Sequence, residues 1–138
     1  MACPYFYPTE RFLQALWPHA SRLPLGDGLA GRCCADPAGE AVPSQAALEN
    51  HCNLGYARGQ CGRFPGSAGP EAVRFTVSSQ ENGIVRIYYV LERDHRPYEH
   101  GPLEYDTKRR ALVALPSSRL LARQAEAYVD SYLRRRLA

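Results

Sequence analysis

The sequence predicts one α+β domain spanning residues 1–138. An irregular, cysteine-bearing N-terminal part (residues 1–69) should pack on a four-stranded antiparallel meander covered by a C-terminal helix (residues 70–138). Alternating apolar residues predict the strands, and apolar residues at helical spacing near the end predict the helix. The first half instead holds all five cysteines and nine of the 11 glycines. A length of 138 residues suits a single domain.

The strands of the second half are predicted from alternation and from one turn. The run AVRFTVSS from Ala72 alternates apolar and polar residues, as a half-buried strand does. Asn82-Gly83 is a strong hairpin signal, because both residues tolerate positive φ. The return run IVRIYYVLER is rich in β-branched and aromatic residues and should lie centrally. A polar loop over residues 94–102 then precedes the strands LEYDT and ALVAL.

The last element is predicted to be a helix that covers the sheet. Pro116 ends the preceding strand, and Ser117 or Ser118 can cap the helix. Two packed layers are the simplest way to bury both the apolar helix face and the sheet. The apolar face consists of Leu121, Ala125, Tyr128, Val129, Tyr132 and Leu133.

The N-terminal half gives weaker patterns. We expect a short helix from Glu10 to Leu16 with Thr9 as its cap, and a second helix, SQAALENHC, introduced by Pro43-Ser44. Residues 21–43 have no usable period, and they are too many for an idle connection. We therefore expect something other than a regular hydrogen-bond ladder to fix this stretch.

The cysteines predict a metal centre. They occupy four separate positions: Cys3, the pair Cys33-Cys34, Cys52 and Cys61. Four thiolates are the ligand set of a structural zinc site or of a [4Fe-4S] cluster. Adjacent residues of an extended chain point to opposite sides, so only one of the pair should bind. We assign Cys3, Cys33, Cys52 and Cys61 as ligands, with Cys34 as the substitute for Cys33.

The spacing favours the cluster over zinc. Structural zinc sites usually hold two cysteines two to four residues apart, and this chain has no such pair. A cluster is larger and can be reached by single cysteines from separate loops. It also needs an apolar cover, which nearby aromatic residues can supply. A zinc-stabilised protein-interaction module is the first alternative. Cysteines that simply pack as small apolar residues are another.

A small cysteine-dependent enzyme is the remaining alternative. His51 precedes Cys52, but neighbours in a helix do not face each other. His19 is distant from Cys34 in the sequence, and only folding of the chain could bring the two side chains together. A filled centre with four thiolates has no open position for a substrate, so electron transfer, redox sensing or structural support is expected before catalysis.

A second cluster of polar residues falls in the predicted loop before the third strand. It brings together Asp94, His95, Glu99 and His100, from which an acid–base or second metal site could be built. Such a segment is more often a solvated connection between strands. The sequence leaves the role of this segment open.

Composition limits the partners. The net charge of +3 is a mild bias, and Arg134-Arg135-Arg136 suits the negative end of the C-terminal helix, so we do not expect nucleic-acid binding. No apolar run is long enough to span a bilayer, and the first residues do not form a secretory signal. We expect a cytoplasmic protein with reduced thiols and a redox or protein partner. No small-molecule substrate is indicated.

Overall fold

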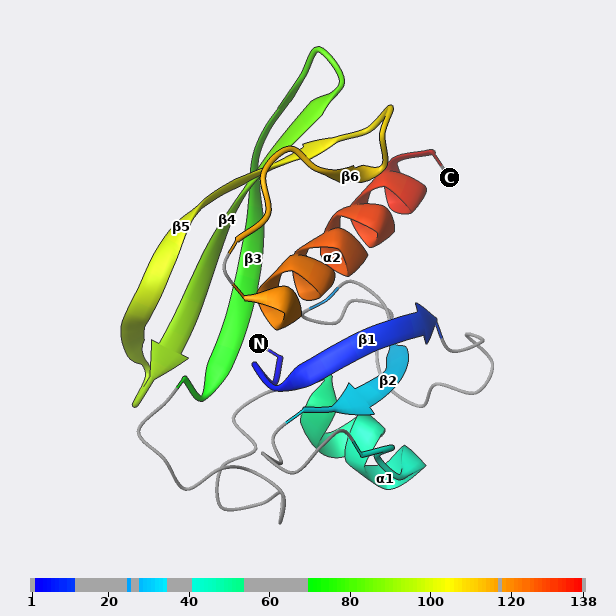
Figure 1. Cartoon of the computed structure of the whole chain (residues 1–138), viewed down its shortest axis with the longest axis vertical. Helices are drawn as coiled ribbons and strands as arrows, with labels where there is room; N and C mark the ends of the chain where they lie inside the picture. Colours follow the sequence, from blue (N-terminus) through cyan, green and yellow to red (C-terminus); the bar gives the residue numbers. More distant parts are fainter. Residues whose placement is uncertain are drawn as a thin grey trace.

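The computed structural model describes residues 2–11, 25, 28–34, 41–53, 70–116 and 118–137, and it confirms the α+β class. Figure 1 shows a long, curved antiparallel sheet with helix α2 (Arg119–Leu137) along one face. A smaller unit with its own pair of strands and a short helix lies beside the beginning of α2. The four described cysteines, Cys3, Cys33, Cys34 and Cys52, belong to this smaller unit.

The large sheet is the predicted meander. Its strands are β3 (Ala72–Glu81), β4 (Ile84–Arg93), β5 (Arg96–Asp106) and β6 (Ala111–Leu112), and they lie side by side in sequence order. All neighbouring pairs are antiparallel. The central position predicted for the second strand is confirmed, because β4 is hydrogen-bonded on both sides.

Both long hairpins close through two-residue turns with positive φ. Asn82 and Gly83 have φ values of 52° and 80°, which confirms the predicted turn. Asp94 and His95 close the next hairpin with φ values of 52° and 60°, although neither is glycine. The buried Glu71 carboxylate accepts a hydrogen bond of 2.9 Å from the Asp94 backbone N–H. This bond holds a turn whose backbone conformation is unfavourable for residues with side chains.

The loop predicted over residues 94–102 is wrong. The turn occupies only Asp94 and His95, and β5 begins at Arg96 and absorbs the rest of that stretch. β5 contains Pro97 and Pro102, and it pairs with β6 only at Tyr105 and Asp106. Along most of β5 one edge is therefore unpaired within the described sheet, and such an edge tolerates proline. The last predicted strand is also shorter, since β6 ends at Leu112.

The core lies between α2 and the inner sheet face. The predicted cap is confirmed at Ser118, whose hydroxyl accepts a hydrogen bond of 3.2 Å from the Leu121 N–H. The apolar helix face predicted from the sequence is buried or packed against the core. Opposite it lie apolar side chains from the four strands: Val73, Phe75, Val85, Ile87, Leu103, Tyr105 and Leu112. In the described part of the chain, no helix is both long and apolar enough to cross a membrane.

The smaller unit contains strands that the sequence did not predict. β1 (Phe6–Arg11) pairs antiparallel with β2 (Leu29–Cys33). The helix predicted from Glu10 is wrong at its start, because Glu10 and Arg11 end β1 and Thr9 lies within it; residues 12–16 lie outside the described residues. The expectation that no regular hydrogen-bond ladder fixes residues 21–43 is wrong for Leu29–Cys33, which form β2, while residues 21–24, 26–27 and 35–40 lie outside the described residues. Gly31 allows the pairing, since a Cβ there would lie 2.1 Å from the Tyr7 backbone oxygen.

The predicted second helix is confirmed, but it has two forms. It begins as α1 (Gln45–Ala47), where the Ser44 hydroxyl accepts a hydrogen bond of 3.2 Å from the Ala47 N–H. It continues as the π-helical turn η2 (Leu48–Cys52). The wider turn is closed by a bond of 3.4 Å from the Asn53 N–H to the Leu48 carbonyl. π-Helical turns are rare and concentrate at functional sites.

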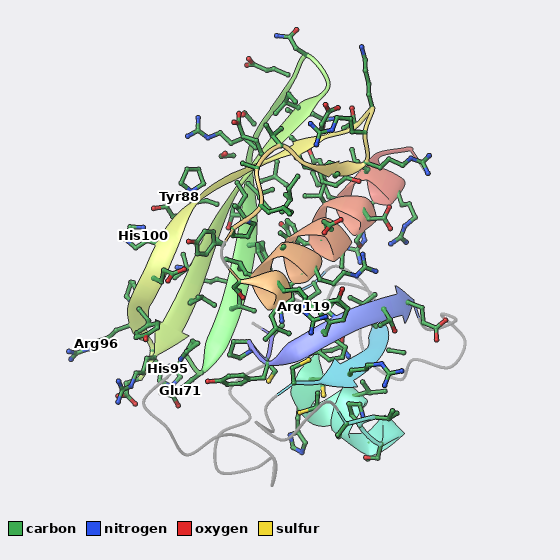
Figure 2. The ribbon with its side chains drawn as sticks, viewed as in Figure 1. Glu71, Tyr88, His95, Arg96, His100 and Arg119 are labelled. Carbon is green, nitrogen blue, oxygen red and sulfur yellow. The ribbon has the colours of Figure 1, made fainter. Side chains whose placement is uncertain are left out.

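Helix α2 fastens the smaller unit to the sheet. The Gln124 side-chain amide donates hydrogen bonds of 2.9 Å and 2.7 Å to the backbone oxygens of Cys3 and Phe6. The Arg119 guanidinium, labelled in Figure 2, lies 4.8 Å from the centre of the Tyr7 ring. On the other side, Ala2 forms a β-bridge with Val73 of β3. The N-terminal segment is thus held by both layers of the larger part.

Candidate cysteine site

Cys3 and Cys52 lie on adjoining backbone segments. The Cys3 N–H donates a hydrogen bond of 3.1 Å to the Cys52 carbonyl, so the segment before β1 contacts the end of η2. Both residues are buried. Two cysteines separated by 48 intervening residues in the sequence are therefore neighbours in the protein.

Cys33 and Cys34 extend this neighbourhood across β2. Cys33 pairs directly with Phe6 of β1, and the Cys34 N–H donates a bond of 2.9 Å to the Tyr5 carbonyl. Directly paired residues present their side chains on the same face, and Phe6 is only 1% exposed. The register thus places Cys33, which is itself half-buried, on the same face as Phe6. Figure 2 draws the sulfur atoms, in yellow, where β1, β2 and α1 meet.

A buried amide fixes this arrangement. Asn53 directly follows Cys52 and is fully buried. Its carbonyl oxygen accepts a bond of 3.1 Å from the Leu29 N–H, and its NH₂ group donates to the Leu29 and Leu48 carbonyls at 3.0 Å and 2.9 Å. The side chain therefore extends the ladder of β2 and joins it to η2. A hydrogen-bonded polar group of this kind specifies one packing of the two elements.

The surroundings of Cys3 are apolar and aromatic. Burial raises the pKa of Tyr5, and the neighbouring Cys3 and Tyr98 raise it further. Tyr5 and Phe6 are two of the aromatic residues expected to cover the centre, and both belong to the core around Cys3 and Cys52. Burial beside Cys3 therefore penalises the ionised form of the Tyr5 phenol.

The described residues do not contain a complete ligand set. Among them, no group of three or more His, Cys, Asp or Glu side chains is arranged to hold a metal ion. Cys61, the fourth predicted ligand, and His19 lie outside the described residues. His51 adds one feature, because its Nδ1 atom is buried and has no hydrogen-bond partner.

The polar residues at 94–100 do not gather into one site. In β5, Glu99 and His100 are adjacent and project to opposite sheet faces. Glu99 accepts a hydrogen bond of 3.0 Å from the Tyr89 hydroxyl, and His100 is hydrogen-bonded to Tyr88 through Nδ1. Figure 2 shows the Tyr88–His100 pair on the side of the sheet away from α2, and His95 at the hairpin tip. The strand thus disperses side chains that are close in sequence.

No family model, curated protein or solved structure matches this chain. Its function is therefore inferred from its own residues.

Two positioning residues escaped the sequence analysis. In the sequence, Asn53 resembles an ordinary residue at the end of a helix, two positions before Gly55. Gln124 lies three residues after Leu121 and one before Ala125, inside the apolar helix stripe. A polar residue on a buried stripe is a usable signal, because it needs buried partners.

Proposed function

We propose that this chain is a cysteine-ligated metal-binding protein that holds a [4Fe-4S] cluster. The proposed ligands are Cys3, Cys33, Cys52 and Cys61, with Cys34 as the substitute for Cys33. The observation that supports the proposal is the direct backbone contact between Cys3 and Cys52, with Cys33 in the neighbouring strand pair opposite Phe6.

The local structure supports thiolate ligation in three ways. Cys3 and Cys52 are buried, so water is excluded from two of the four positions. Cys33 shares a strand face with the buried Phe6, which favours it over Cys34 as the third ligand. Cys52 ends the π-helical turn that Asn53 locks to β2, so its backbone is held before any ligand binds.

Chemically, a bound cluster would supply reversible one-electron transfer. Four thiolates fill its coordination, which fits electron transfer, redox sensing or structural support rather than substrate turnover. Because thiolate ligands must stay reduced, the proposal also implies a reducing compartment such as the cytoplasm. A redox protein is the partner this function requires.

Anaerobic purification tests the proposal. The protein should be brown, with broad visible absorption that dithionite bleaches and with iron and acid-labile sulfide in equal amounts. A colourless protein with stoichiometric zinc would contradict the cluster and support a zinc-stabilised interaction module. Protein without any metal would contradict both, and one thiol hyper-reactive toward iodoacetamide would then favour a cysteine enzyme.

Matched serine variants test the ligand assignment. Cys52→Ser should lose the colour and disorder the N-terminal half, whereas Cys34→Ser should retain both colour and fold. Cys33→Ser distinguishes the two members of the pair. Loss of the cluster in Cys34→Ser but not in Cys33→Ser would show that Cys34 is the ligand.

A further inference from the structure

A polar cleft of about 360 Å³ lies between α2, β1 and the turn that follows β5. It opens at the end of the β1–β2 pair where Arg11 faces Leu29, and Cys33 lies at the opposite end of this pair. Three carboxylates and three guanidinium groups line it: Glu10, Glu126, Asp130, Arg110, Arg123 and Arg134. The cleft is therefore rich in charge of both signs and has no net charge of its own.

Part of this charge is already engaged. Arg123 donates hydrogen bonds to the Pro8 and Thr9 carbonyls at 2.7 Å and 3.2 Å. Arg134 pairs with Asp130 at 3.4 Å. These contacts hold the walls of the cleft together. They leave Glu10, Glu126 and Arg110 as the charged lining groups with no hydrogen bond or ion pair to another described residue.

A buried tyrosine, Tyr105, lies near charged groups of both signs in the cleft. Tyr105 is 5% exposed and lines the cleft. Burial raises the pKa of Tyr105, Asp130 and Glu126 raise it further, and Arg110 lowers it. One buried phenol thus has carboxylates and a guanidinium close by. Its hydroxyl stays protonated at neutral pH and can donate a hydrogen bond.

Size and charge restrict the ligand. A volume of about 360 Å³ is at the lower end of the range of about 300–1,000 Å³ for ligand pockets, so the ligand should be small. A phosphate-bearing molecule would place its negative charge beside Glu126 and Asp130. An apolar molecule would displace water from the charged lining groups without giving them new partners, which is costly. A molecule with one positive and one negative group can pair with lining groups of both signs.

We propose that this cleft binds a small zwitterion of the α-amino acid class. The ammonium group would pair with the Glu126 carboxylate, and the ligand carboxylate would pair with the Arg110 guanidinium and accept a hydrogen bond from Tyr105. Glu10 would face the ammonium side of the opening. This binding site is independent of the metal centre, since it uses none of the cysteines.

Calorimetric titration of the full chain with each proteinogenic L-amino acid tests the site. For any that binds, the N-acetyl form lacks the ammonium and the amide form lacks the carboxylate. Each capped form should bind about ten- to a hundredfold more weakly, because one charge-assisted contact is lost. Absence of binding by every free amino acid, or equal binding by the capped forms, would overturn the proposal.

Paired variants separate a binding role from a structural one. Glu126→Gln and Arg110→Gln should weaken binding about tenfold or more, and Tyr105→Phe should do so with the fold retained. Glu104→Gln and Arg109→Gln are the matched controls, because both residues are exposed and outside the cleft. Equal weakening by the control substitutions would place the site elsewhere, and circular dichroism checks that each variant is folded.

Discussion

Replacement of Gln124 should weaken the attachment of the N-terminal segment to helix α2. The side chain is 1% exposed, and its amide donates two hydrogen bonds, of 2.9 Å and 2.7 Å, to the backbone of the first strand and the residues before it. Gln124→Met keeps the length of the side chain and removes both donors. The carbonyls of Cys3 and Phe6 then lose a partner inside the core.

The expected cost follows from these two bonds. A buried hydrogen bond contributes about 1–1.5 kcal/mol, so the variant should lose about 2–3 kcal/mol of unfolding free energy. Domains of this kind have about 5–15 kcal/mol in total, so the loss is large but leaves the protein folded. Urea unfolding followed by circular dichroism measures the difference. Fluorescence of Trp17, the single tryptophan, reports on the N-terminal half.

Gln80→Met is the matched control. Gln80 is exposed and accepts one hydrogen bond of 3.2 Å from the Tyr132 hydroxyl at the surface. The same chemical change there should cost less than about 0.5 kcal/mol. Equal unfolding free energies for Gln124→Met and the unaltered protein would refute the reasoning, because they would mean that the Gln124 amide does not stabilise the two carbonyls.

Three further perturbations test the same framework. Asn53→Ala removes three buried hydrogen bonds and should cost about 3 kcal/mol in urea unfolding; a loss below about 1 kcal/mol would show that the amide does not join β2 to η2. Gly31→Ala would place a Cβ 2.1 Å from the Tyr7 backbone oxygen, so it should lower the melting temperature despite the usual gain of about 0.4–1 kcal/mol from a stiffer unfolded chain; an unchanged or higher value would contradict that close approach. Burial raises the pKa of Tyr128 in the folded protein, so its contribution to stability is complete below the ordinary tyrosine pKa of about 10 and is lost as pH rises through the higher folded-state pKa. Between roughly pH 9 and pH 12, Tyr128→Phe should therefore lose less unfolding free energy than the unaltered protein does. Identical pH profiles for the two proteins would argue against the shift.

The second half of the chain was predictable because its signals are local. Alternation around Phe75, the Asn82-Gly83 turn and the Ser118 cap each act over a few residues. The prediction failed where a local signal misled. Asp94-His95 lacks the glycine that marks a tight turn. The hydrogen bond that stabilises this turn is accepted by Glu71, which lies 23 positions before Asp94 in the sequence. No residue close to the turn in the sequence indicates this hydrogen bond.

The composition of the first half pointed to the cysteines, but the conformation of this half was not predictable from the sequence. β1 and β2 are short and are joined by pairing between distant residues, and neither alternates clearly. Pro8 and Gly31 look like chain breakers in the sequence, yet they face each other in the register. The cysteines stood out by residue type alone, whereas Asn53 and Gln124 gain their importance from partners that no local window contains.

The large sequence separation between Gln124 and its hydrogen-bond partners has a consequence for synthesis on the ribosome. Its bond to Cys3 joins residues 121 positions apart, so the first strand cannot reach its final partner until α2 has left the exit tunnel. Contacts of such high sequence separation form late and slow folding. The Cys3 thiol would therefore stay accessible to metal donors and oxidants during translation, and it would be enclosed only as the last helix docks.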